Sequence, residues 1–226
     1  MEKIEHNLTI INKQINDAEN KYNRKPGSVS LLAVSKKHSI ELIKIAHSLG
    51  QNHFGENFVQ EGVEKIHALK SKKLCWHFIG HIQSNKTRII AENFDWVHTV
   101  DRLKIAERLS KQRPNTAKDL NICVQVNIDR EDAKSGVYIE ELGRICNAIQ
   151  RLPKLKLRGL MCIPIAKNKH SDQRLSFAKL NNQKQLISQN LTNLDTLSMG
   201  MTNDYMAAIQ EGATIIRIGT ALFGAR

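Results

Sequence analysis

One lysine near the start of the chain and a glycine-threonine pair near its end have the side chains and amides needed for carbonyl chemistry. Lys36 ends the run "LLAVSK", and Gly219-Thr220 follow the run "IIRI". A lysine amine condenses with an aldehyde to form an imine, and glycine amides beside a hydroxyl can cradle a phosphate. If the two runs are neighbouring strands, they predict a site for an aldehyde that carries a phosphate.

The alternation of side chains along a strand decides whether Lys36 faces the interior. In an extended strand, Leu32, Val34 and Lys36 share one face. A lysine that faces the interior must be neutral or paired, because an isolated buried ammonium is costly. The adjacent Lys37 would favour the neutral amine, which is the nucleophilic form. The alternative is that both lysines form the solvated end of a strand, as most lysines do.

The last apolar run places a cation and a glycine on one face. Ile215, Arg217 and Gly219 alternate along it, so all three point to the same side. If that side is the interior, Arg217 can face the ring nitrogen of a pyridine and keep it unprotonated, because a guanidinium stays charged. The alternative is that Arg217 pairs with a carboxylate such as Glu56.

A second loop, "SMGMTND", has the composition of an anion site. Ser198 supplies a hydroxyl, Gly200 lets the backbone approach closely, and the amides from Gly200 to Thr202, including that of Met201, can point at the same anion. Phosphate sites of parallel barrels commonly form in the loops after strands seven and eight. Two such loops side by side favour a phosphate site over ordinary turn chemistry.

These residues need a scaffold that brings the ends of several strands together. Short apolar or β-branched runs alternate along the chain with segments of helical periodicity. The predicted strands are Leu31 to Ser35, His53 to Gly55, Trp76 to Gly80, Trp96 to Val100, Ile122 to Ile128, Leu155 to Ile163, Thr196 to Gly200 and Thr214 to Ile218. The predicted helices between them are Ile40 to Leu49, Phe58 to Leu69, Gln83 to Ala91, Arg102 to Lys111, Ile139 to Leu152, Arg174 to Asn190 and Tyr205 to Glu211.

The alternation predicts a fold of the α/β class. Strands joined by crossover helices are parallel, and eight such units close most naturally as a (β/α)8 TIM barrel. Spacing alone does not show closure, so an open doubly wound sheet is the alternative. The length predicts a single domain over residues 1–226. An extra N-terminal helix is predicted by apolar residues at helical spacing, namely Ile4, Leu8, Ile11 and Ile15.

One stretch lacks a periodic pattern. Residues Pro164 to Ser176 are polar and predict a mobile loop that leads into the seventh helix.

Composition narrows the class of ligand and the setting. The chain has 34 Lys+Arg against 22 Asp+Glu, a net charge of +12 that favours anionic ligands. The basic residues lack interleaved aromatics, so no dedicated nucleic-acid binding is expected. No run approaches the roughly 18 apolar residues of a membrane span, and the N-terminus lacks the pattern of a signal peptide. The four cysteines show no CxxC pair and are interpreted as buried free thiols. We expect a cytoplasmic protein without a membrane association.

Four blocks of sequence carry a family resemblance. "LLAVSK", "HFGENFVQE", "WHFIGHIQSNK" and "LSMGMTNDYMAAIQEGATIIRIGTALFG" resemble the pyridoxal-phosphate homeostasis protein family in order and spacing, from about Leu31 to Gly224. The resemblance implies a barrel of the alanine racemase N-terminal domain type that binds pyridoxal 5'-phosphate (PLP) through an imine to Lys36. The other cofactor contacts that it implies are to Asn57, to Ser198, Gly200 and Met201, to Arg217 near the pyridine nitrogen, and to Gly219 and Thr220.

The resemblance also implies a role. Members of the family are described as carriers or regulators in PLP (vitamin B6) and amino-acid homeostasis, without an established catalytic reaction. The chain departs from the family pattern in two places: "SKKHS" lacks the proline often seen after the lysine, and Thr202 stands where serine is common. Neither change removes a group that the binding needs. We therefore expect a monomeric PLP carrier whose partners are PLP and PLP-dependent apoenzymes.

A PLP-dependent racemase is the first alternative. A two-base racemase needs a second acid or base, often a tyrosine, opposite the lysine. The racemases that this barrel resembles take that tyrosine from an additional β domain, for which 226 residues leave no space. Tyr22, Tyr138 and Tyr205 are the tyrosines present, and each is interpreted as a packing or surface residue. No catalytic residue is expected, and a basic nucleic-acid-binding protein is the second alternative.

Two other groups of residues are given ordinary interpretations. His77 and His81 are four residues apart but straddle a predicted strand end and lack a clear third ligand, so no metal site is expected. Glu56, Glu61 and Glu64 lie on or beside one predicted helix and are expected to be solvated.

Overall fold

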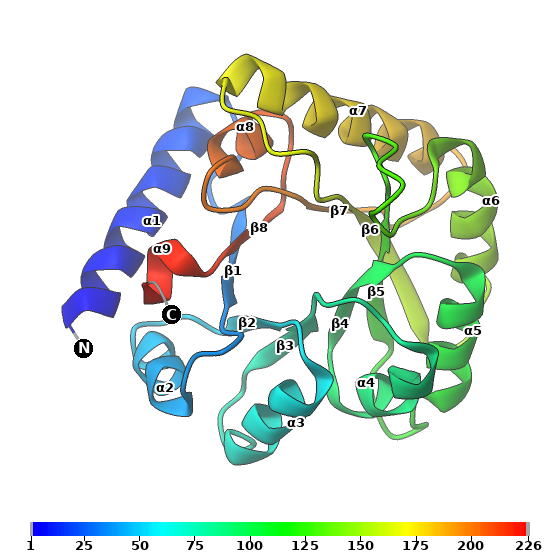
Figure 1. Ribbon diagram of the computed structural model, residues 1–226, viewed down its shortest axis with the longest axis horizontal. Helices are drawn as coiled ribbons and strands as arrows, with labels where there is room; N and C mark the ends of the chain where they lie inside the picture. The colour runs from blue at the N-terminus through cyan, green and yellow to red at the C-terminus, as the bar shows by residue number, and fades with distance from the viewer. Residues whose placement is uncertain (1, 225–226) are drawn as a thin grey trace.

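The computed structural model describes residues 2–224 and shows a closed parallel barrel (Figure 1). The strand order follows the chain from β1 to β8, and β1 pairs in parallel with β8. The predicted (β/α)8 barrel is therefore confirmed, and the open doubly wound sheet is wrong. The outermost residues of the predicted domain 1–226 lie outside the described range. The strands are β1 Ser30–Val34, β2 His53–Glu56, β3 Cys75–Phe78, β4 Trp96–Val100, β5 Leu120–Gln125, β6 Leu155–Met161, β7 Thr196–Ser198 and β8 Ile215–Ile218.

Helices surround the ring of strands, as Figure 1 shows. They are α1 Glu2–Lys21, α2 Ile40–Ser48, α3 Val59–Ala68, α4 Thr87–Asn93, α5 Leu103–Gln112, α6 Ile139–Gln150, α7 His170–Ser188, α8 Tyr205–Gln210 and α9 Thr220–Phe223, with a short 3-10 turn, η1 Ser84–Lys86, before α4. Helix α7 begins at His170, four residues before the predicted start. Its first turn is largely exposed and polar, so no apolar periodicity marked it in the sequence.

Strand side chains alternate between two cores. The outward faces pack against the helices in one large apolar cluster. Side chains from five different strands also contact one another in a separate cluster, which places them inside the barrel. These interior residues are Leu32, Trp96, Cys123, Met161 and Ile215.

The predicted N-terminal helix is present as α1. It buries the apolar stripe Ile4, Leu8, Ile11 and Ile15, and it contacts α2, α8 and α9. Each buried aliphatic side chain of this kind contributes about 1.5–3 kcal/mol relative to exposure. Helix α1 therefore fastens the first and last segments of the barrel together (Figure 1). Within residues 2–224, no helix is long and apolar enough to span a membrane.

Candidate functional site

A cavity of about 210 Å³ lies at the carboxyl ends of the strands and holds six of the eight predicted site residues. These six are Lys36, Asn57, Met201, Arg217, Gly219 and Thr220. Ser198 and Gly200 are not among the residues that line it. The remaining lining residues are Val34, Ile79, Ile163 and Thr202. Strands β1 and β8 are neighbours, and Leu32 of β1 pairs in register with Arg217 of β8. Lys36 after β1 and Gly219 after β8 therefore reach the same cavity.

The predicted inward faces of β1 and β8 are confirmed. Leu32 belongs to the interior cluster, and Val34 and Lys36 line the cavity above it. Lys36 is partly buried and lines the cavity, which favours an inward lysine over a solvated strand end for this residue. The interpretation as a solvated strand end holds for Lys37, which is exposed and places its ammonium 5.8 Å from the centre of the Phe58 ring.

A buried ionic network holds the turn that presents Lys36. The Nζ of Lys65 donates to the carbonyl of Ser35 at 2.7 Å, to Glu56 Oε1 at 2.8 Å and to Glu61 Oε1 at 2.6 Å. The Ser35 hydroxyl also donates to Glu56, at 2.6 Å. The residue that precedes Lys36 is therefore fixed through both its side chain and its backbone.

The residue that follows the lysine is fixed in the same way. The Lys37 amide donates to the carboxylate of Glu61, and Lys37 adopts a left-handed φ of 61°. A non-glycine residue takes this conformation only where the surroundings enforce it. The backbone on both sides of Lys36 is thus anchored to helix α3 and to the end of β2.

The expectation that Glu56 is solvated is wrong. Glu56 is fully buried and burial raises the pKa of its carboxyl, against the opposing effects of Lys65 and Ser35. Its Oε2 atom is buried and has no hydrogen-bond partner among the described residues. The sequence showed Glu61 and Lys65 four residues apart, the pattern of an ordinary exposed helix pair. It did not show that the end of β2 lies beneath them.

Arg217 is held by neutral oxygens. It is 4% exposed, and its guanidinium donates to the carbonyl of Ser198 at 2.6 Å, to the Ser198 hydroxyl at 2.8 Å and to the carbonyl of Cys162 at 2.9 Å. The alternative that Arg217 pairs with Glu56 is wrong, because Glu56 pairs with Lys65. Burial lowers the pKa of Arg217 from its usual value. A buried cation without a bound carboxylate is well suited to face a ligand.

Ser198 lies behind Arg217 and begins a column of buried polar groups. Its Oγ is 2.7 Å from His98 Nδ1, and His98 Nε2 is 2.8 Å from His77 Nδ1. All three side chains are at most 1% exposed. Burial, with the charge of Arg217 as a smaller cause, lowers the pKa of His98 to about 3. The column is therefore neutral, and it connects Arg217 to the opposite end of the barrel.

The two glycines predicted for the anion site have different roles in the backbone. Gly200 has a φ of +94°, and a Cβ there would lie 2.6 Å from the Cβ of Ala208. At Gly219, a Cβ would lie 3.1 Å from the carbonyl oxygen of Val34. Gly200 thus permits a left-handed turn, whereas Gly219 permits close contact with β1.

Backbone amides at this end of the cavity are only partly engaged. Thr220 begins helix α9, and the first amides of a helix have no partner within it. By contrast, the Met201 amide donates to Asp204 Oδ1 at 2.6 Å. Burial raises the pKa of Asp204, so this carboxylate is not strongly held in its charged form.

Asn57 places an unsatisfied polar atom beside the cavity. It follows β2 and lines the cavity, and its Oδ1 is buried with no hydrogen-bond partner among residues 2–224. A buried oxygen of this kind costs about 1–3 kcal/mol when it stays unsatisfied. The adjacent Gly80 is required sterically, because a Cβ there would lie 1.9 Å from the Asn57 carbonyl oxygen.

Two apolar walls of the cavity were missed as site residues. Ile79 follows β3 and Ile163 follows β6, and both line the cavity. Their apolar character made them look like ends of buried strands. Their position at the carboxyl ends of the strands was the only signal available in the sequence.

Comparison with known proteins identifies the family. The family described as "Alanine racemase, N-terminal domain" matches residues 2–226. The "Pyridoxal phosphate homeostasis protein" of Pseudomonas aeruginosa is 50% identical over 226 residues, which cover 100% of this chain and 97% of that protein. The chain belongs to the pyridoxal phosphate homeostasis protein family.

Solved structures agree with this family and with the fold. PipY of Synechococcus elongatus, described "with PLP bound", has a TM-score of 0.81 and 36% sequence identity, over 93% of this chain and 100% of PipY. Alanine racemase of Corynebacterium glutamicum has a TM-score of 0.74 at 12% identity, over 100% of this chain but 62% of the racemase. The racemase likeness shows the shared barrel alone.

Proposed function

We propose that this protein holds PLP in the carboxyl-end cavity and acts in PLP and amino-acid homeostasis. The observation that carries the proposal is that Lys36, Arg217 and the Gly219-Thr220 pair line one cavity. PLP has three recognisable groups, an aldehyde, a pyridine nitrogen and a phosphate. An amine, a buried guanidinium and a cradle of amides with a hydroxyl complement them in turn. The PLP-bound structure of the related PipY supports this choice of ligand.

Lys36 and Arg217 act on the aldehyde and the ring. When bound, PLP supplies the aldehyde with which Lys36 forms an imine. Arg217 lines the same cavity and is buried there. A guanidinium beside the pyridine nitrogen also keeps that nitrogen unprotonated, which limits how far the ring can withdraw electrons. This arrangement suits retention of the cofactor better than carbanion chemistry.

The phosphate is assigned to the loops after β7 and β8. Thr220 supplies a hydroxyl and the first amides of α9, and Gly219 lets the backbone approach. Met201 forms the second side, on a turn that Gly200 permits, and its amide would exchange Asp204 for the phosphate. The unsatisfied Oδ1 of Asn57 would accept a hydrogen bond from a donor group of the bound ligand.

A holding role is favoured over racemisation. The relatives are named for homeostasis and not for a reaction. Tyr205 donates its hydroxyl to Gln14 Oε1 of α1 at 2.6 Å, and none of the three tyrosines lines the cavity. The position of a second acid or base is thus not filled by a tyrosine of the described chain.

The mouth of the cavity is suited to transfer. Ile163 and Met201 line the cavity and are 36% and 38% exposed, which gives the opening an apolar rim. We propose that a monomer presents this rim to PLP-dependent apoenzymes. A cytoplasmic, reducing setting is supported by the four cysteines, all of which are free thiols.

An absorbance spectrum with matched lysine variants tests the proposal. Purified protein mixed with PLP should absorb at about 420 nm, as a protonated imine does, and borohydride should fix the cofactor on Lys36. Lys36→Ala should abolish both signals. Lys37→Ala should keep them, because the Lys37 side chain lies over the Phe58 ring and does not line the cavity. A colourless mixture, or labelling that persists in Lys36→Ala, would refute the assignment. Steady racemisation of amino acids that is lost with Lys36→Ala would favour the racemase instead.

A further inference from the structure

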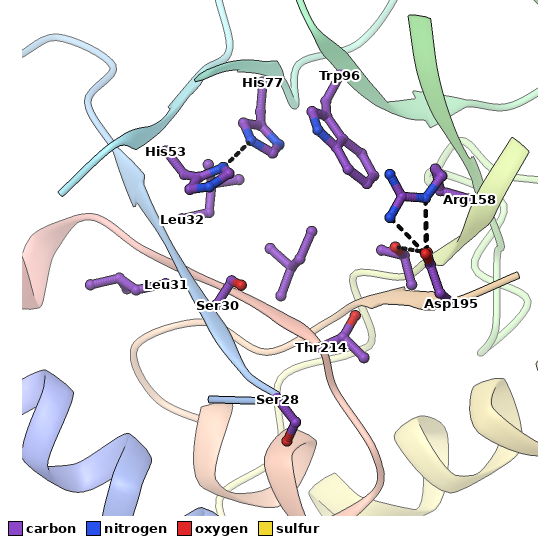
Figure 2. A pocket seen from close by; sticks show the side chains of 12 residues that line it. Ser28, Ser30, Leu31, Leu32, His53, His77, Trp96, Arg158, Asp195 and Thr214 are labelled. Carbon is purple, nitrogen blue, oxygen red and sulfur yellow. Dashed lines mark hydrogen bonds and ion pairs between the residues drawn. The ribbon is translucent and has the colours of Figure 1, made fainter. Parts of the chain in front are cut away.

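A second cavity opens at the amino ends of the strands. It has a volume of about 280 Å³ and is shown in Figure 2. His53 and His77 lie on one side of it, the ion pair of Arg158 and Asp195 lies on the other, and Trp96 lies between them, with the Arg158 guanidinium 4.7 Å from its ring centre. The proposed PLP site uses none of these side chains.

Three metal-binding side chains meet beside this cavity. Cys75 and His77 are two residues apart on β3, so they share the inward face of that strand. His53 is the residue of β2 that lies opposite Cys75. His53 Nδ1 is 3.0 Å from His77 Nε2, and Cys75 Sγ is 3.4 Å from the same nitrogen. All three candidate ligand atoms lie within 4.8 Å of one another.

Hydrogen bonds among the three side chains satisfy this cluster poorly. A neutral imidazole nitrogen carries either one proton or one lone pair, yet His77 Nε2 has two polar neighbours, His53 Nδ1 and Cys75 Sγ. A single hydrogen bond can serve only one of those neighbours well. An ion at the centre would receive a lone pair from all three atoms at once.

We propose that His53, Cys75 and His77 bind a zinc ion whose fourth position faces the amino-end cavity. Two imidazoles and one thiolate form one of the ligand sets that Zn²⁺ takes when one position stays open for water. Ideal tetrahedral bonds to zinc would place such ligand atoms about 3.3–3.6 Å apart. The observed separations of 3.0 and 3.4 Å from His77 Nε2 are therefore close to what the ion requires.

The surroundings hold the central ligand in the right orientation. His77 Nδ1 is 2.8 Å from His98 Nε2, so the nitrogen that does not face the cluster is already engaged. The ring of Trp96 stacks on that of His77 at 5.3 Å between centroids and an angle of 11°. Partners that orient a metal-binding histidine in this way strengthen metal binding.

The charges around the cluster are compatible with a cation. The carboxylate of Asp95 lies beside the cluster, where it accepts from the amide of Trp76, the residue between Cys75 and His77, at 2.8 Å. Arg158 is neutralised by Asp195 at 2.6 Å. On binding, the thiol of Cys75 gives its proton to water and the sulfur donates its electron pair to Zn²⁺, without any redox change.

From the sequence alone no metal site is expected, and the zinc proposal departs from that expectation. That expectation considered His77 together with His81. In the structure His77 is buried inside the barrel, whereas His81 is exposed and lies 3.3 Å from Ser135 Oγ. The true companions of His77 are 24 residues before it and two residues before it, and only strand pairing brings the first of them close.

Titration with Co²⁺, which reports its ligands in its visible spectrum, tests the site on the full reduced chain. We expect one Co²⁺ per chain with a thiolate charge-transfer band, and displacement of Co²⁺ by Zn²⁺. Cys75→Ala should remove the charge-transfer band and weaken Zn²⁺ binding at least about 100-fold, the upper end of what loss of a merely orienting partner costs. His53→Gln should weaken it comparably, with the folded state verified by circular dichroism.

Matched thiol and histidine controls separate this site from other binding. Cys146→Ala removes a buried thiol on α6, away from the cluster, and should leave the Co²⁺ spectrum unchanged. His81→Gln should also leave it unchanged. Absence of the charge-transfer band in the unmodified chain, or its persistence in Cys75→Ala, would overturn the proposal. Either result leaves the PLP assignment intact, because that assignment is read from the lysine imine.

Discussion

The two ends of the barrel interior are held by different kinds of residues and interactions. At the carboxyl end, residues that follow the strands surround the cavity, and the ion pairs of Lys65 with Glu56 and Glu61 hold the turn that carries Lys36. At the amino end, most of the lining side chains belong to the strands, and the close contacts of His53 and His77 are between neutral groups, across the cavity from the ion pair of Arg158 and Asp195. One end is thus positioned by charge and by loops, and the other by strand register.

The difference shows how one barrel can separate two kinds of binding. Loops and helix starts can present amides and a flexible amine to an anionic ligand. Strand positions have fixed spacing, which suits a small ion that requires set distances between its ligands. The column of Ser198, His98 and His77 joins the two ends, so a change at one end has a short path to the other.

Removal of Lys65, the lysine of the ionic network that holds the turn at Lys36, should produce the largest loss of stability. Lys65→Met leaves the Glu56 carboxylate fully buried with only the Ser35 hydroxyl as a partner. Loss of one partner from a buried ion pair costs about 3–5 kcal/mol. We expect urea unfolding to show a decrease of this size, together with weaker PLP binding because the turn at Lys36 loses its anchor.

Two variants serve as comparisons for the loss of stability in Lys65→Met, one at the protein surface and one at the amino end. Lys13→Met removes an exposed lysine of α1 and should change stability by less than about 0.5 kcal/mol. His53→Gln exchanges one neutral side chain for another and should cost about 1 kcal/mol. If Lys65→Met costs no more than His53→Gln, the carboxyl end is not braced by charge.

A glycine exchange should produce an intermediate effect and identify the end that it disturbs. In Gly80→Ala the added Cβ would lie 1.9 Å from the carbonyl oxygen of Asn57, so the backbone must shift. We expect a loss of about 1–3 kcal/mol, as for other overpacked positions. PLP affinity should fall as well, because Asn57 lines the carboxyl-end cavity.

The same substitution elsewhere supplies the controls. A Cβ at Gly143 in helix α6 meets nothing within 4 Å, so Gly143→Ala should stabilise the protein by about 0.5–1 kcal/mol. A Cβ at Gly159 would lie 1.8 Å from the Thr196 carbonyl oxygen, and Thr196 borders the amino-end cavity. Gly159→Ala should therefore destabilise the barrel but spare PLP affinity. Equal losses of PLP affinity in Gly80→Ala and Gly159→Ala would show that the two ends are not independent.

The sequence predicted the carboxyl end better than the amino end for a physical reason. Lys36, Arg217 and Gly219 could be placed on inward faces because side-chain direction alternates within a strand. The barrel and its N-terminal helix followed in the same way, from local periodicity. Six of the eight predicted site residues line one cavity as a result.

What escaped prediction depends on contacts between segments that are distant in the sequence. Glu56 was taken as solvated because the fit of β2 beneath α3 leaves no local pattern. The cluster at His53 and Cys75 was missed because it needs the register of β2 against β3, which periodicity does not fix. Asp204 on the Met201 amide is a turn contact for which "SMGMTND" permits several alternatives.

The smallest expected effect is a pH dependence confined to the carboxyl end. Burial raises the pKa of Glu56 above its ordinary value of 4.5, so the folded state binds this proton more tightly than the unfolded state. Stability should therefore fall as the pH rises from about 4.5 through the raised pKa, and level off above it. Glu56→Gln removes this component, so the stability of that variant should fall less over the same window.

Thermal unfolding of matched variants between pH 4 and pH 8, roughly the window over which a raised carboxyl titrates, would isolate this component. Glu64→Gln changes an exposed carboxyl on the same helix and should keep the pH slope of the unmodified chain. His53→Gln should also keep that slope in the upper part of the pH range. Burial lowers the pKa of His53, so this side chain is neutral in that part of the range. A slope in Glu56→Gln equal to that of the unmodified chain would mean that Lys65 keeps Glu56 ionised despite its burial. The carboxyl end would then be braced by a fully charged triad, and the contrast with the neutral donors of the amino end would be sharper still.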